Sequence, residues 1–231
     1  MSNMGKNLSK RLKEKAIELG ASVVGIADAR KFDEAPEGHR PRDVLEDATA
    51  VISMGVAQPR AVIQRAMPTQ YTRNIFTTAG MCDGIASQMS LWIEDQGFDA
   101  IPISARFLYM DGLTGLFRGD LSHKHAAMLA GLGEIGLNTL LINPTYGIRL
   151  MLVSVVTNAP VLPDSPYTES LCPRSECLKC VTACPVKAIS SSGEIDKEKC
   201  AKYYRRYPDI YFETWGLYFC RECRTVCPVP E

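Results

Sequence analysis

Eight of the nine cysteines of this 231-residue chain lie within about its last 60 residues, in two runs with the same ending. The first run is spaced C-x4-C-x2-C-x3-C before a proline and consists of Cys172, Cys177, Cys180 and Cys184. The second ends in C-x2-C-x3-C before a proline and consists of Cys200, Cys220, Cys223 and Cys227. Bacterial two-cluster ferredoxins carry C-x2-C-x2-C-x3-C-P, and the last cysteine of each run ligates the other cluster. The shared ending therefore predicts a duplicated, ferredoxin-like module with two 4Fe–4S clusters.

The same spacing predicts which cysteines share a cluster. A tight C-x2-C turn lets two thiolates reach adjacent irons, whereas the cysteine before proline can reach the neighbouring cluster, about 10 to 12 Å away. The first cluster is expected on Cys172, Cys177, Cys180 and Cys227. The second is expected on Cys184, Cys200, Cys220 and Cys223. Structural zinc is the competing interpretation, but a zinc ribbon normally needs two C-x2-C pairs separated by some 15 to 20 residues and has no use for paired C-x3-C-P endings.

Charge and hydropathy indicate where such a protein works. No apolar run approaches the roughly 18 residues that span a bilayer, and the first 20 residues alternate charged with apolar side chains, unlike a signal peptide. A cytoplasmic location without membrane attachment is therefore expected, where clustered cysteines indicate metal or redox chemistry. The 26 basic and 26 acidic residues cancel, which excludes a global field that attracts nucleic acid.

Hydrophobic periodicity predicts an α/β domain ahead of the cysteines. Apolar residues at three- and four-residue steps predict helices, and continuous apolar runs predict strands. The expected helices cover 8–19 and 78–96, and the expected strands cover 22–27, 48–57, 100–104 and 148–160. Cys82 falls on the apolar stripe of the second helix and is expected in the core. Composition changes near residue 165, so we expect an α/β domain over 1–165 and the cysteine-rich module over 166–231.

A glycine-rich stretch, 130–147, contains Gly131, Gly133 and Gly136 in the spacing G-x-G-x-x-G. A dinucleotide-binding fingerprint must follow a strand and precede an acidic residue by about 20 positions. Here the preceding segment is expected to be helical, and no acidic residue lies between Glu134 and Asp164. Dinucleotide binding is therefore disfavoured. Two explanations stay open: sharp turning of the backbone, or a flat cofactor lying against bare backbone.

Several segments together resemble the epoxyqueuosine reductase and reductive dehalogenase superfamily. They are ELGASVVGIADA, WIEDQGFDAIPIS, AGLGEIGLNTLLINPTYG and CLKCVTACPVKAI, in this order and over nearly the whole chain. The resemblance implies a nitroreductase-related, cobalamin-binding domain followed by the two-cluster module. It also implies that the glycine loop, with Gly131, Gly133, Gly136 and Asn138, packs against the corrinoid. Electrons would then pass from a ferredoxin or flavodoxin through both clusters to cobalt and to a small organic or modified-base substrate.

The chain departs from that family at the expected proton donor. Epoxyqueuosine reductases have a tryptophan where this chain has Glu134, and an Asp-x-x-Pro run before the glycines that supplies the acid. The candidates for that acid here are Asp120, His123 and Tyr109, with Tyr146 nearby. A histidine metal pair of His123 with His125 is disfavoured, because residues two apart on a helix point to different sides.

Further departures concern the substrate. The family's C-terminal helical repeats near tRNA and the twin-arginine export signal of dehalogenases are missing from this sequence, and its net charge is zero, so tRNA is a disfavoured substrate. The basic segment 196–207 is expected to be a solvated helix face around Cys200. A second functional class stays open: an electron-transfer protein whose clusters reduce a partner, such as a corrinoid protein, without a substrate of its own.

Overall fold

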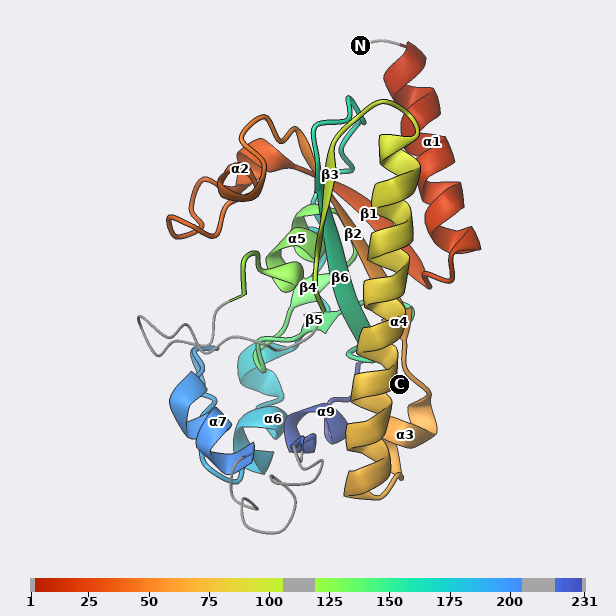
Figure 1. Cartoon of the computed structure of the whole chain (residues 1–231). Coiled ribbons are helices and arrows are strands. Elements are labelled where there is room, and N and C mark those ends of the chain that lie inside the picture. The colour runs from red at the N-terminus through yellow and green to blue at the C-terminus, as the bar shows by residue number, and fades with distance from the viewer. Residues whose placement is uncertain (1–2, 106–118, 205–218, 230–231) are drawn as a thin grey trace.

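The computed structural model describes residues 3–105, 119–204 and 219–229, and Figure 1 shows two parts. A sheet covered by helices on both faces forms the larger, N-terminal part. Short helices at one end of that sheet form the smaller, cysteine-rich part. The mixed α/β architecture and the separate cysteine-rich module are as the sequence predicted, whereas the relation to nitroreductases stays a prediction.

The sheet has four strands in the order β1-β2-β6-β3, and each neighbouring pair is antiparallel. Their bounds are β1 Val23–Asp28, β2 Ala50–Ala57, β3 Ala100–Ile103 and β6 Leu150–Thr157. All four expected strands are therefore present. The long strands β2 and β6 read as continuous apolar runs because helices bury both of their faces. On one face Ser53 lies opposite Ser154.

Two long helices, α1 (Asn3–Glu18) and α4 (Pro68–Glu94), pack on one face of the sheet. Their buried stripes meet β2 and β6 in a common core that includes Leu12, Cys82 and Met89, each fully buried. The prediction that Cys82 is a core residue is confirmed. Helix α4 begins at Pro68 rather than near residue 78, because proline is favourable at the first helical position and the side chain of Gln70 accepts the N–H of Met67 at 3.0 Å.

The opposite face of the sheet is covered by α5 (His123–Leu129), with η1 (Ala29–Phe32) and α2 (Pro41–Val44) beside it. A Cβ on Gly25 of β1 would meet the carbonyl oxygen of Ala130, so glycine lets the end of α5 approach the sheet. Past α5 the chain forms a two-stranded hairpin, β4 (Glu134–Ile135) with β5 (Leu141–Ile142). This hairpin and α3 (Arg60–Gln64) were not predicted.

The cysteine-rich module is built of short elements. They are η2 (Arg174–Glu176), α6 (Lys179–Ala183), α7 (Lys197–Tyr204) and α9 (Glu222–Thr225). Among the described residues from 172 onward, the buried hydrophobic side chains are Ala188 and Ile189, and all eight cysteines are partly exposed. A core this small does not hold a fold by hydrophobic burial alone. Across the described part of the chain, every helix is too short or too polar to traverse a bilayer.

The segment around the predicted boundary at residue 165 still contacts the α/β part. Asp164 accepts a hydrogen bond from the backbone N–H of Ile26, at 2.9 Å, and pairs with Lys13. The N–H of Tyr167 donates to the carbonyl of Met128 at 3.0 Å. The boundary itself stays a prediction.

Candidate metal centre

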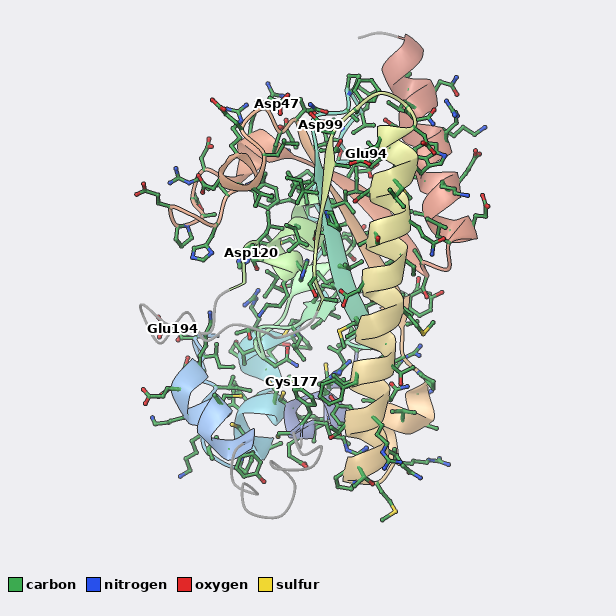
Figure 2. All side chains as sticks on the ribbon, viewed as in Figure 1. Asp47, Glu94, Asp99, Asp120, Cys177 and Glu194 are labelled. Carbon is green, nitrogen blue, oxygen red and sulfur yellow. The ribbon has the colours of Figure 1, made fainter. Side chains whose placement is uncertain are left out.

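The structure brings four cysteines from both ends of the module to one pocket. They are Cys172, Cys177, Cys180 and Cys227, the same four that the spacing assigns to one cluster. Figure 2 labels Cys177 at the junction between the module and the α/β part. Leu137, Asn138 and Ile142 of the glycine loop and hairpin line the same pocket. The glycine loop therefore lies directly against the first set of cysteines.

The other four cysteines form a second set: Cys184 after α6, Cys200 in α7, Cys220, and Cys223 in α9. Burial, together with the neighbouring Cys220 and Cys200, raises the pKa of the Cys223 thiol to about 12. Cys180 of the first set also raises that pKa, so the two sets adjoin at Cys180 and Cys223. Crowded, buried thiols need a strong positive charge to ionise, which iron supplies when it binds them.

Both sets suit iron–sulfur clusters in their chemistry. Among the described residues no three His, Cys, Asp or Glu side chains converge as the ligands of one ion would. A cubane cluster does not require such convergence, because each of its four thiolates binds a separate iron. The backbone N–H of Ala188 donates to the sulfur of Cys184 at 3.2 Å, the kind of contact that tunes a cluster potential.

Glu134 joins the glycine loop to the start of the cysteine module. One carboxylate oxygen accepts the backbone N–H groups of Leu171 and Cys172, at 2.7 and 2.9 Å, and the other accepts Arg174 at 2.8 Å. Burial by itself would raise the pKa of Glu134, but the backbone donors and Arg174 outweigh burial and lower that pKa. The glutamate therefore stays ionised and positions the first cysteine.

Arg224 of α9 makes the corresponding connection on the other side of the module. It donates to the hydroxyl of Tyr71 at 2.9 Å, and to the side chain of Gln58 and the carbonyl of Ile148, both at 2.7 Å. Tyr71 is 2% exposed, and the guanidinium of Arg221 also lies over its ring, 5.5 Å from the centroid. Sequence patterns did not reveal Arg224, Tyr71 or Gln58, because their contacts join positions more than 150 residues apart.

The predicted cofactor-binding loop packs against its own hairpin and against the segments of Ser165 and Cys223. A Cβ on Gly131 would lie 2.6 Å from the carbonyl oxygen of Ser165, and one on Gly133 would overlap the carbonyl of Ile142. Both residues have a positive φ, +77° and +153°. Side chains disfavour this backbone conformation, so glycine is required at both positions. Asn138 is buried, and its amide donates to the carbonyl of Cys223 at 3.3 Å.

At Gly136 an added Cβ would meet the side chain of Ile142 at 2.6 Å, inside the hairpin. Contacts within the protein therefore account for all three glycines and for Asn138. The predicted contact between this loop and a corrinoid stays a prediction.

The proton-donor candidates are placed differently. Nε2 of His123 lies 3.0 Å from the carbonyl oxygen of Ser104, which can only accept, so Nε2 carries the proton. Nδ1 then accepts from the hydroxyl of Ser154 at 2.9 Å. Burial lowers the pKa of His123, which keeps the ring neutral. Both ring nitrogens are thus used in joining α5 to the sheet.

Asp120 is exposed just before α5, and Figure 2 shows it near the centre of the molecule. Tyr109 lies outside the described residues. Tyr146 follows the hairpin beneath the guanidinium of Arg149, at 5.7 Å. His125 is exposed and contacts Ser122. The structure thus brings none of the described candidates together as a group.

Comparison with known proteins agrees with this arrangement. Residues 175–230 match the model of a 4Fe–4S double cluster binding domain. Epoxyqueuosine reductase of Bacillus subtilis (strain 168) is 34% identical over 249 residues, which are 95% of this chain and 64% of that protein. The enzyme of Lactococcus garvieae (strain Lg2) is 26% identical over 250 residues, 96% of this chain and 70% of that protein. The chain thus spans about two thirds of the length of these relatives.

Solved structures show the same fold. Epoxyqueuosine reductase from Streptococcus thermophilus matches with a TM-score of 0.68 and 21% identity, over 96% of this chain and 66% of that one. A reductive dehalogenase described with a B12-dependent mechanism matches with a TM-score of 0.73 and 23% identity, over 97% of this chain and 32% of that one. The resemblance predicted from the sequence is therefore confirmed: this chain is similar to epoxyqueuosine reductases, has the fold they share with reductive dehalogenases, and carries a 4Fe–4S double cluster domain.

Proposed function

We propose that this protein is an iron–sulfur reductase that passes single electrons from a ferredoxin or flavodoxin through two 4Fe–4S clusters. The first cluster is bound by Cys172, Cys177, Cys180 and Cys227, and the second by Cys184, Cys200, Cys220 and Cys223. The observation that carries the proposal is the pocket in which the first four thiols meet beside the glycine loop. When this cluster is reduced, its electron is close to the loop that resembles the family's cofactor-binding segment.

The acceptor that the resemblance implies is cobalamin, and the substrate class is a small organic molecule or a modified base. When bound, a reduced corrinoid supplies a nucleophilic cobalt centre, and the protein supplies orientation and a proton. Asp120 is our candidate for the proton donor, because the ring nitrogens of His123 are both engaged with Ser104 and Ser154. The alternative is an electron-transfer protein that reduces a partner, and the close packing of the loop glycines against Ser165 and Ile142 favours it.

One experiment separates the two functions. The protein is purified anaerobically from cells supplied with cobalamin, and iron, sulfide, cobalt, absorbance and EPR spectra are measured. Two clusters with stoichiometric cobalt, giving a base-off cobalt(II) signal, support the reductase. Two clusters without retained cobalt favour the electron-transfer protein. A wild-type protein without 4Fe–4S signals would contradict both.

The ligand assignment is tested by Cys177→Ser, with Cys82→Ser as the matched control. We expect the first variant to lose one cluster, about half of its iron, and to keep the signal of the other. The control should keep all its iron, because Cys82 is a core residue on α4. Full iron content in Cys177→Ser would refute the assignment.

The substrate is tested by single-turnover assays. A solved epoxyqueuosine reductase with this fold holds an epoxyqueuosine-modified tRNA stem-loop. One series of assays therefore uses this stem-loop as the substrate, and a second series uses free small-molecule epoxides and aryl halides. Replacement of Asp120 by Asn should slow turnover about 100-fold, the usual contribution of a general acid, without loss of the clusters. Unchanged turnover would assign the proton to another group.

A further inference from the structure

Arg224 is adjacent in sequence to Cys223 of the second set and three residues before Cys227 of the first. Its guanidinium donates to a phenol, a carboxamide and a backbone carbonyl, as described above, and all three acceptors are neutral. Within the described part of the chain no carboxylate pairs with it; Glu222 on the same helix is exposed. The positive charge is therefore held in place without neutralisation.

The Nε donor of this guanidinium is unsatisfied among the described residues. The Nε atom of Arg224 is buried and has no hydrogen-bond partner among the described residues. A buried donor on a cation without an acceptor is unfavourable, and native structures seldom keep one unless a further group satisfies it. Cluster sulfurs are acceptors, and reduction gives a cluster bound by four thiolates one more negative charge.

The other cluster has a different electrostatic environment. The basic group that contacts the segment of Cys172 is Arg174, which lies 2.8 Å from Glu134 and is neutralised by it. Lys179 lines the pocket of the first set, but it is exposed, as is Lys187, and water screens the charge of an exposed lysine. One cluster thus adjoins a cation that neutral groups hold in place, whereas the cations beside the other cluster are an ion-paired arginine and an exposed lysine.

We infer that Arg224 is a positioning and tuning residue that raises the reduction potential of the cluster bound by Cys184, Cys200, Cys220 and Cys223 above that of its neighbour. A buried positive charge stabilises the reduced, more negative state of the adjacent cluster, and net charge and hydrogen bonds are among the factors that set cluster potentials. The same guanidinium fixes α9 to Tyr71 and Gln58, so the charge does not move on reduction. The inference rests on the proposed pair of clusters.

The test is an EPR-monitored redox titration of the full-length protein carrying both clusters. Replacement of Arg224 by Gln removes the charge and keeps similar volume. At the wild-type midpoint, the ratio of reduced to oxidised second cluster should fall at least about tenfold, which for a one-electron couple is about 59 mV. The first cluster should change much less. Combining the variant with Cys177→Ser leaves the second cluster alone and identifies its signal.

Three variants separate the charge from the structural connection. Replacement of Arg224 by Lys keeps the charge and should keep most of the potential, although Lys cannot reproduce the planar fork. Gln58→Glu places a carboxylate against the guanidinium and should lower the reduction potential of the second cluster with Arg224 still present. This variant keeps the test possible if Arg224→Gln does not fold. Arg30→Gln, an exposed position paired with Asp28, makes the same change in net charge and should shift neither cluster.

Unchanged potentials, or equal shifts of both clusters, in Arg224→Gln and Gln58→Glu with full iron content would overturn this inference and leave the proposed function intact. Absence of two clusters from the wild-type protein would instead refute the proposed function.

Discussion

Glu134 determines how the first cysteine is presented, through one carboxylate that serves two backbone donors and one arginine. Replacement of Glu134 by Gln should lower the free energy of unfolding at neutral pH by about 1–3 kcal/mol, the usual value of charge-assisted hydrogen bonds at a mostly buried site. The measurement is anaerobic thermal unfolding with iron analysis. Glu169→Gln, at an exposed position, is the control and should change the free energy of unfolding very little. A near-neutral effect of the Glu134 change would contradict this account.

His123 predicts a pH dependence of stability. Its folded pKa is lowered by burial, whereas the unfolded histidine titrates near about 6.5. Below about pH 6.5 the unfolded chain therefore binds more protons than the folded one, and stability falls as pH falls toward the folded pKa. Unfolding temperatures at about pH 7.5, 6.5 and 5.5 should show this decrease, and His123→Gln should weaken it. If His123→Gln and the wild type had the same slope of stability against pH, His123 would not be the source of that slope.

At the level of elements, replacement of glycine by alanine is expected to have opposite effects on stability in the β4–β5 hairpin and in helix α4. A Cβ at Gly133 would overlap the carbonyl of Ile142, with φ at +153°, so Gly133→Ala should destabilise by more than about 3 kcal/mol. A Cβ at Gly84, exposed on α4, would meet nothing within 4 Å, so Gly84→Ala should stabilise by about 0.5–1 kcal/mol. Chemical denaturation of both variants checks the pair; equal effects would refute the role of backbone contact at Gly133.

Elements with a strong local pattern could be predicted from the sequence, and those held by distant contacts could not. Strands β2 and β6 are long apolar runs, and α5 was expected from its sequence alone. The hairpin β4–β5 has only two residues in each strand and depends on the approach of Gly133 to Ile142. The cysteine spacing gave the sets of thiols, whereas the contacts of Glu134 and Arg224 join distant segments and leave no local pattern.

At the scale of the whole molecule, the two parts differ in what holds them together. The sheet is buried between helices, whereas the described module from residue 172 buries little besides Ala188 and Ile189. Metal binding that orders such a module contributes directly to its folding. Anaerobic removal of iron by a chelator should therefore lower amide hydrogen-exchange protection in 172–204 and 219–229 by at least about tenfold, while β2 and β6 change less. Equal loss of protection in both parts would contradict this.

The sheet order also has a consequence for the time at which the protein can acquire its clusters. Strand β6 is the last strand of the sheet in chain order, yet it lies between β2 and β3. During synthesis β3 therefore has no neighbour in the sheet until residues 150–157 leave the ribosome. The first cluster cysteine, Cys172, emerges shortly after that strand. The surface on which the module docks is thus completed only just before the thiols that need it, so iron insertion is expected to follow the completion of the sheet.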